Sequence, residues 1–165
     1  MKKKYYIFIS IVLLITIYFI FFYKKVDSYD EIININQKYD SLEDIKKKGY
    51  IDLTEVQEKE NKDVKNFLQS FKANVEAELK VITKDKNGKI MLTFFDIHTG
   101  YKVIRAHSRP YDKQSLDLIG YSDFKIEKNK DIYEVYLKDT YYPTPMAGKE
   151  KGYFGWDLLY RYKEE

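Results

Sequence analysis

The sequence predicts an α+β protein: an N-terminal transmembrane helix, then two short helices packed on a five- or six-stranded antiparallel meander sheet. Three observations predict this fold. Residues 5–23 form one long apolar run, apolar side chains recur with a helical period over residues 64–75, and from residue 77 onward they alternate as in strands. The 165-residue chain accordingly divides into a membrane anchor with basic flanks (residues 1–25), a stalk (26–40) and an extracytoplasmic domain (41–165).

The apolar run at residues 5–23 is the strongest signal in the chain. It contains no charged residue, glycine or proline, and as a helix it would be about 28 Å long, which is close to the thickness of a bilayer core. Tyr5 and Tyr23 mark the two ends of the span, where tyrosine rings favour the membrane interface. Lysines precede and follow the run, but acidic residues come soon after the lysines on its C-terminal side and offset their positive charge. The positive-inside rule therefore predicts a single-pass signal-anchor in the cell membrane, with a cytoplasmic N-terminus and the C-terminal domain outside.

Two other interpretations of this run stay open. A cleaved signal peptide normally has a shorter apolar region and a cleavage site of small residues, whereas only the poor site Val26-Asp27-Ser28 follows here. A buried soluble helix would need strongly apolar partners downstream, which the sequence lacks. Anchoring and cleavage after export both place the domain outside the cell.

Two helices are predicted before the sheet. Ser41 is a suitable N-cap for a short helix that Gly49 ends, and residues 50–53 follow as a short strand or extended arm. Asn61 is a suitable cap for the second helix. The apolar residues of that helix fall on one face, and they are Val64, Phe67, Leu68, Phe71 and Val75.

Alternating residues predict five consecutive strands after these helices. The first two, residues 77–83 and 90–97, flank Asn87-Gly88, which indicates a hairpin with a type I′ turn. A third strand over residues 101–107 precedes a loop that includes Pro110 and runs to Gly120. The last two strands are expected over residues 121–128 and 132–138, and the aromatic tail after residue 152 is expected to add a sixth strand or a lid.

The composition excludes several classes of function. The chain has no cysteine, so disulfides, cysteine-ligated metal centres, thiol catalysis and a lipid-bearing cysteine are ruled out. The formal net charge of +3 arises from lysines beside the apolar run, namely Lys2, Lys3, Lys4, Lys24 and Lys25. The rest of the chain is slightly acidic, and we therefore expect no nucleic-acid partner.

No motif predicts a catalytic or metal centre. His98 falls in a turn and His107 near the end of the following strand, so a shared metal site is not expected. No G-x-S-x-G nucleophile elbow occurs in the sequence. We expect no metal and no cofactor, and the sequence leaves enzymatic activity undecided with its absence favoured.

Candidate ligand-binding residues form two groups. The polar loop contributes Tyr111, Asp112 and Asp117, whose carboxylates suit acid–base chemistry or calcium binding, or simply turn formation. The last segment, from residue 141 onward, contributes Tyr142, Tyr153 and Trp156, which suit stacking on a glycan or peptide, or covering of the sheet.

The functional prediction is a membrane-anchored, extracytoplasmic binding or interaction module for a protein or cell-wall ligand. One alternative is a cell-surface hydrolase that uses the loop at residues 111–117. The other alternative is an inhibitor or immunity-type protein.

Short motifs in residues 41–139 resemble a domain family of unknown function in small exported, often lipid-anchored proteins of Gram-positive bacteria. The motifs occur in the family's order: residues 48–52, 66–68, 82–92, 111–117 and 133–137. The sequence departs from the family pattern in lacking cysteines near the last two strands and in having Asn87 where the pattern has an acidic residue. The resemblance implies an extracytoplasmic α+β domain and transfers no catalytic residue.

Overall fold

The computed structural model describes residues 28–35, 40–140 and 155–164. The predicted anchor with Tyr5 and Tyr23, and the candidate residues Tyr142 and Tyr153, lie outside the described residues. Within the described ranges, no helix combines the length and the apolar character needed to cross a bilayer.

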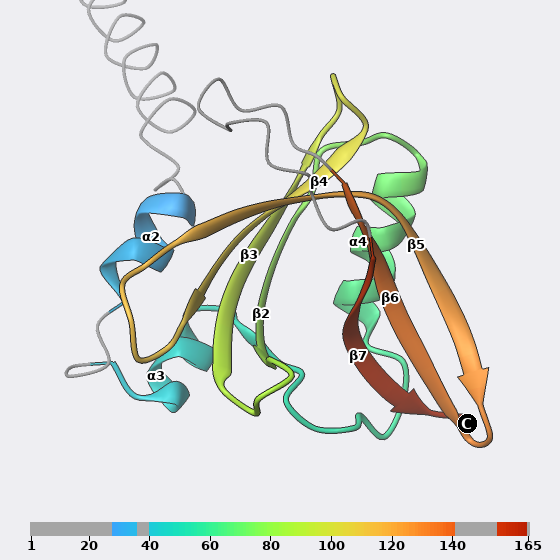
Figure 1. Cartoon of the computed structure of the whole chain (residues 1–165), viewed down its shortest axis with the longest axis horizontal. Helices are drawn as coiled ribbons and strands as arrows, with labels where there is room; N and C mark the ends of the chain where they lie inside the picture. The colour runs from blue at the N-terminus through green and yellow to red at the C-terminus, as the bar shows by residue number, and fades with distance from the viewer. Residues whose placement is uncertain (1–27, 36–39, 141–154, 165) are drawn as a thin grey trace, which may run out of the picture.

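One curled sheet of seven strands forms the centre of the molecule, and the strands follow one another in chain order (Figure 1). They are β1 (Ile51–Asp52), β2 (Glu78–Lys84), β3 (Ile90–His98), β4 (Val103–Pro110), β5 (Asp117–Asn129), β6 (Ile132–Thr140) and β7 (Trp156–Lys163). The predicted α+β class and the antiparallel meander of five consecutive strands, β2 to β6, are confirmed. The predicted strand number is wrong, because β1 pairs parallel with β2 and β7 pairs antiparallel with β6, which gives a mixed seven-stranded half-barrel.

The predicted loop from residue 108 to Gly120 is shorter in the structure. Ser108 and Arg109 continue β4, and Pro110 occupies its last position, where a proline ends the hydrogen-bond ladder without interrupting it. β5 already begins at Asp117, which pairs with Ser108. Only residues 111–116 connect the two strands.

The hairpin at Asn87-Gly88 is confirmed, but the predicted type I′ turn is wrong. Within the turn only Gly88 has a positive φ, at 78°, whereas a type I′ turn needs positive φ at both central residues. Asp85 and Lys89 close a longer loop, and the Asp85 side chain accepts hydrogen bonds from the backbone N–H groups of Asn87 and Lys89, each at 2.8 Å. The hydrogen bonds to this aspartate therefore stabilise the longer turn, which lacks the backbone geometry of a two-residue turn.

Three helices in the described part of the chain, one more than predicted, pack on the sheet: α2 (Ser28–Asn34), α3 (Leu42–Lys47) and α4 (Lys62–Lys72). Both predicted caps are confirmed, since Ser41 forms a capping box with Asp44 and the Asn61 side chain accepts from two backbone N–H groups. The apolar stripe of α4 is buried at Val64, Phe67 and Leu68. Val75 does not belong to it, because the helix ends before that residue and its side chain is 54% exposed.

The helices cover opposite faces of strands β2 to β4, and each face has its own core (Figure 1). α4 lies inside the curl, where its buried side chains meet residues such as Leu79 and Phe95; we call this the inner core. α2 and α3 lie outside, where they pack on Ile82, Leu92 and Phe94; we call this the outer core. Burial on both faces explains why apolar residues in β2 and β3 occur next to one another, where a half-exposed strand would alternate.

α2 lies in the segment that the sequence predicts as a stalk. Ile32 and Ile35 are almost completely buried in the outer core, and Glu31 forms an ion pair with Lys80 at 2.5 Å. Residues 28–35 of the segment are therefore packed on the sheet and do not act as a free spacer.

Candidate functional site: a groove inside the curled sheet

The curl brings the first and last parts of the sheet together along a seam, which we define as the boundary between residues 53–57 and β7. At one end the seam is bridged, because the Gln57 N–H donates to the Arg161 carbonyl at 2.9 Å and the Lys163 N–H donates to the Gln57 carbonyl at 3.0 Å. Along the rest of the seam, residues 53–56 and the first half of β7 border a cavity of about 860 Å³. We call this cavity the groove.

The floor of the groove combines apolar side chains with a few hydroxyl groups. Thr93 and Ser108 are buried on neighbouring strands, and their hydroxyl oxygens are 2.9 Å apart. The remaining floor is apolar, with Phe95, Ala106 and Leu137 among its residues. A mainly apolar lining with a few placed polar groups is typical of ligand sites in proteins.

One end of the groove carries negative charge. The Tyr121 hydroxyl donates to Asp157 Oδ2 at 3.2 Å, and burial, followed by the neighbouring Asp157 charge, raises the pKa of Tyr121. Burial, followed by the same Asp157 charge, also raises the pKa of Asp139. Neither Asp139 nor Asp157 forms an ion pair with a lysine or arginine within the described ranges. Asp157 therefore gives this end of the groove a carboxylate that forms no ion pair with a described basic side chain. Lys84, Lys86 and Arg161 also line the groove, and two of them are paired, Lys84 with Glu55 and Arg161 with Glu134.

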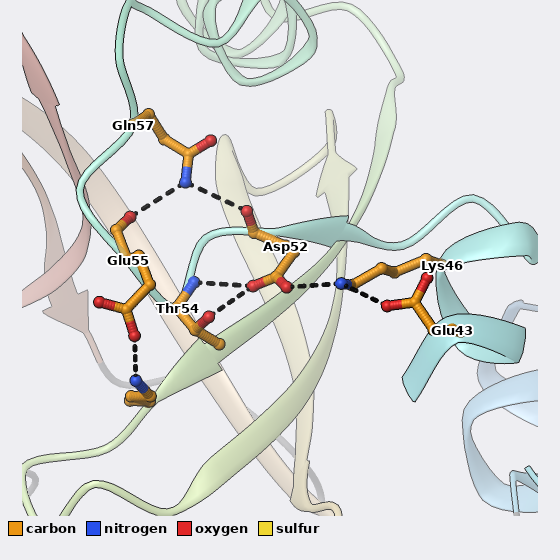
Figure 2. A network of polar contacts seen from close by, with 7 residues as sticks. Glu43, Lys46, Asp52, Thr54, Glu55 and Gln57 are labelled. Carbon is orange, nitrogen blue, oxygen red and sulfur yellow. Dashed lines mark hydrogen bonds and ion pairs between the residues drawn. The ribbon is translucent and has the colours of Figure 1, made fainter. Parts of the chain in front are cut away.

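A polar network fixes the rim of the groove at β1 (Figure 2). Lys46 of α3 reaches Asp52 at 3.0 Å, and Asp52 also accepts hydrogen bonds from the backbone N–H and the hydroxyl of Thr54, at 3.1 and 2.6 Å. Burial alone would raise the pKa of Asp52, but the bonds from Thr54 and then Lys46 outweigh it, so the pKa lies below its ordinary value. The ionised Asp52 thus holds the start of the rim against α3.

Two further contacts hold the loop that continues the rim. The Gln57 amide donates to the carbonyls of Asp52 and Glu55, at 3.2 and 3.0 Å (Figure 2). Glu55 forms an ion pair with Lys84 at the end of β2. The loop is therefore tied to β1, β2 and β7, and the groove has a defined edge on this side.

The predicted loop residues lie away from the groove. The Tyr111 hydroxyl donates to the Asp40 carbonyl at 2.7 Å, and its ring packs on the outer core. Asp112 and Asp117 are exposed, and no hydrogen bond or ion pair joins their carboxylates in the described part of the chain. The structure does not bring these three residues together as a polar site.

Trp156 lies at the edge of the groove, but its ring belongs to the outer face of the sheet. Its neighbour Asp157 points inward to Tyr121, and successive side chains of a strand point to opposite faces. Lys125 Nζ lies 4.6 Å from the Trp156 ring centre and 5.2 Å from that of Tyr136. The cation–π contact with Lys125 covers part of the indole, and Trp156 remains 38% exposed.

The two histidines do not share a site, as predicted. His98 packs on Tyr101 in the β3–β4 turn, whereas His107 packs on Phe94 and lies 3.6 Å from Asp96 on the outer face. No group of three or more metal-ligating side chains occurs among the residues that the structure describes.

The sequence did not indicate the groove residues Thr93, Ser108 and Asp157, or the neighbouring Asp139. One signal could have indicated part of the floor: Thr93 is a polar residue inside the apolar run of β3. No local pattern could have found the two aspartates, because Asp139 and Asp157 belong to different strands that meet only through the pairing of β6 with β7.

Fold and groove together define a class: an α+β half-barrel with an open groove on its concave side. Comparison of the chain with protein-family models, curated proteins and solved structures found no match. The resemblance based on short motifs therefore stays a prediction.

Proposed function

We propose that the protein is a membrane-anchored, extracytoplasmic binding module whose ligand occupies the groove. The observation that carries this proposal is the groove itself, a cavity of about 860 Å³ whose lining combines apolar side chains with hydroxyl and charged groups. Its volume falls in the range of about 300–1,000 Å³ that is typical of ligand sites.

The proposed anchor and the packing of α2 together set where the groove would work. If residues 5–23 span the membrane, only residues 24–27 separate the span from α2. Four extended residues reach at most about 14 Å, so the domain would be held directly at the membrane surface. The ligand would then be one that is present at this surface.

The groove favours binding over the hydrolase alternative. A hydrolase built on residues 111–117 would need Asp112 and Asp117 to converge, and nothing in the described chain joins them. No specific observation favours an inhibitor or immunity-type protein. Binding in the groove is therefore the function that we propose.

Binding can be tested with the detergent-solubilised full-length protein and two pools, solubilised cell-wall fragments and a peptide digest of membrane proteins. We expect native mass spectrometry to detect retained material from one pool. Ser108→Leu should abolish retention because it fills the groove, whereas Ser122→Leu, at an exposed position, should not. Absence of retained material from both pools, or equal retention by Ser108→Leu, would contradict the proposal.

The topology can be tested separately because the chain has no cysteine. A membrane-impermeant maleimide should label Lys86→Cys in intact cells and should not label Lys2→Cys. The reverse pattern, or labelling of neither variant until the cells are broken, would contradict the proposed orientation.

A further inference from the structure

We propose that the ligand of the groove is an extended, basic polypeptide segment that adds as a strand to the free edge of β7. This inference rests on the proposed function and specifies the class of partner. β7 is the last strand of the sheet and pairs with β6 on one side only. Across the seam, its backbone bonds to Gln57 at Arg161 and Lys163, and no described residue bonds across the seam to the backbone of residues 156–160.

The direction of the backbone groups follows from the neighbouring bonds. The Gly155 carbonyl accepts from Asp139 of β6 at 3.0 Å, so Gly155 points toward β6. Because successive residues of an antiparallel strand point alternately to either side, the backbone groups of Trp156 and Leu158 face the seam. A row of such groups is a template for another extended backbone.

The edge has few of the features by which proteins protect free strands. Residues 156–160 contain no lysine or proline, and the Leu158 side chain is 40% exposed. A bulge at Leu159 interrupts the strand, and we therefore assign the pairing to Trp156–Leu158. The chain itself already uses this mode at the other end of the seam, where Gln57 adds to β7 in parallel orientation.

The groove under the edge defines the side chains of the partner. A strand in the seam would present every second side chain to the floor. That floor offers the hydroxyls of Thr93 and Ser108, and the lining also includes the carboxylate of Asp157, which forms no ion pair with a basic side chain of the described chain. Asp139 lies close enough to Asp157 for the Asp157 charge to raise its pKa. A lysine or arginine of the partner would supply the positive charge that pairs with the carboxylate. A lipid chain or an anionic polymer would leave both the backbone edge and the carboxylates unpaired.

The probe for this inference is a blocked heptapeptide of alternating valine and threonine with one central lysine. The full-length protein in detergent has a single tryptophan, Trp156, whose emission reports binding because the peptide contains none. We expect saturable binding and slower hydrogen exchange of the amides in β7. A peptide with N-methyl groups along one edge, and a peptide with glutamate in place of lysine, should each bind about three- to tenfold more weakly or not at all.

Two variants at one position separate the backbone from the side chain. Leu158→Pro removes a seam-facing N–H and should weaken peptide binding by a similar factor, whereas Leu158→Ala keeps the N–H and should bind nearly as the unchanged protein does. Thermal unfolding identifies a variant that fails to fold. In that case, binding of the N-methylated peptide to the unchanged protein decides whether the ligand adds as a strand. If Ser108→Leu abolishes retention of a natural ligand but the N-methylated and unmodified peptides bind alike, strand addition is wrong and the proposed function stands. If nothing enters the groove, both are wrong.

Discussion

The two helical layers cover opposite faces of the same strands, yet they are held by different chemistry. α4 packs on the inner core through Val64, Phe67 and Leu68, and no buried polar atom of that core lacks a hydrogen-bond partner. α2 packs on the outer core beside Arg109, a fully buried cation. Apolar burial therefore makes the main contribution to the packing of α4, whereas the docking of α2 depends on a few polar contacts.

Arg109 joins the end of α2 to the connection between β4 and β5 through two carbonyl groups. Its guanidinium donates to the Ile35 carbonyl just after the C-terminus of α2, at 2.5 Å, and to the Lys113 carbonyl, at 2.8 Å. α2 has no basic residue in its last turn, so Arg109 supplies the positive charge that a helix C-terminus favours. Burial lowers the pKa of Arg109, because removing the guanidinium from water destabilises its charged form.

The same interface contains polar atoms without partners. Arg109 Nε, the Tyr50 hydroxyl and Glu31 Oε1 find no hydrogen bond within the described chain. Each such atom costs about 1–3 kcal/mol, whereas burial of Ile32 and Ile35 contributes about 2–3 kcal/mol each. The docking of α2 is therefore close to balance, and single changes should shift it measurably.

The largest effect is expected on the inner side. Phe67→Ala should lower the free energy of unfolding by about 3–5 kcal/mol, because it leaves a cavity against Phe95, whose ring centre lies 6.1 Å away. Denaturant unfolding of the whole domain measures this loss, and Phe67→Leu should recover most of it. A loss below about 1 kcal/mol would show that the inner core tolerates cavities and would remove the contrast between the two layers.

On the outer side, Arg109→Leu should release α2 and leave α4 in place. The variant loses two hydrogen bonds from a charged donor, each contributing about 1.5–3 kcal/mol. Hydrogen exchange measured by mass spectrometry should become faster over residues 30–35 and stay unchanged over α4. Equal acceleration in both helices would mean that the two layers unfold as one unit.

Tyr50→Phe should have a smaller effect of opposite sign. It removes the hydroxyl that has no hydrogen-bond partner among the described residues and keeps the buried ring, so the free energy of unfolding should rise by about 1 kcal/mol. Exchange over residues 30–35 should slow accordingly. Destabilisation by this variant would reveal a partner for the hydroxyl and would weaken the comparison.

The smallest effect concerns Asp139, which lies next to the groove residue Asp157. Because the pKa of Asp139 is raised in the folded state, stability is gained as pH falls through that pKa and is lost above it. Asp139→Asn should therefore raise the melting temperature at pH 7 and have no effect near pH 3, where the carboxyl is protonated in both states. A lower melting temperature at pH 7 would show that the ionised carboxylate stabilises the groove.

Local patterns predicted the local parts of the fold. Ser41 and Asn61 cap helices through bonds to residues two or three positions away, and strands β2 to β6 each pair with the next strand of the chain. The docking of α2 left almost no trace in the sequence, because two isoleucines three positions apart in a polar segment do not make a recognisable stripe. Its partner Arg109 would be expected at the surface by residue type.

The candidate site was less predictable, for a related reason. Trp156 was identified as a candidate, and it does border the groove, but the direction of its ring depends on its register with β6. The groove exists because β1 and β7 approach each other across the curl. The sequence determines such an approach only through the twist and bulges of the whole sheet, which no short window contains.

The order of the strands has a consequence for how the chain assembles on the ribosome. Every pairing from β1 to β7 joins consecutive strands, so the sheet can grow one strand at a time as the chain is synthesised. The bond between Glu58 and Lys163 is different, since it joins residues 105 positions apart. It can form only after β7 has been synthesised, and until then the edge of the sheet is exposed to any neighbouring strand.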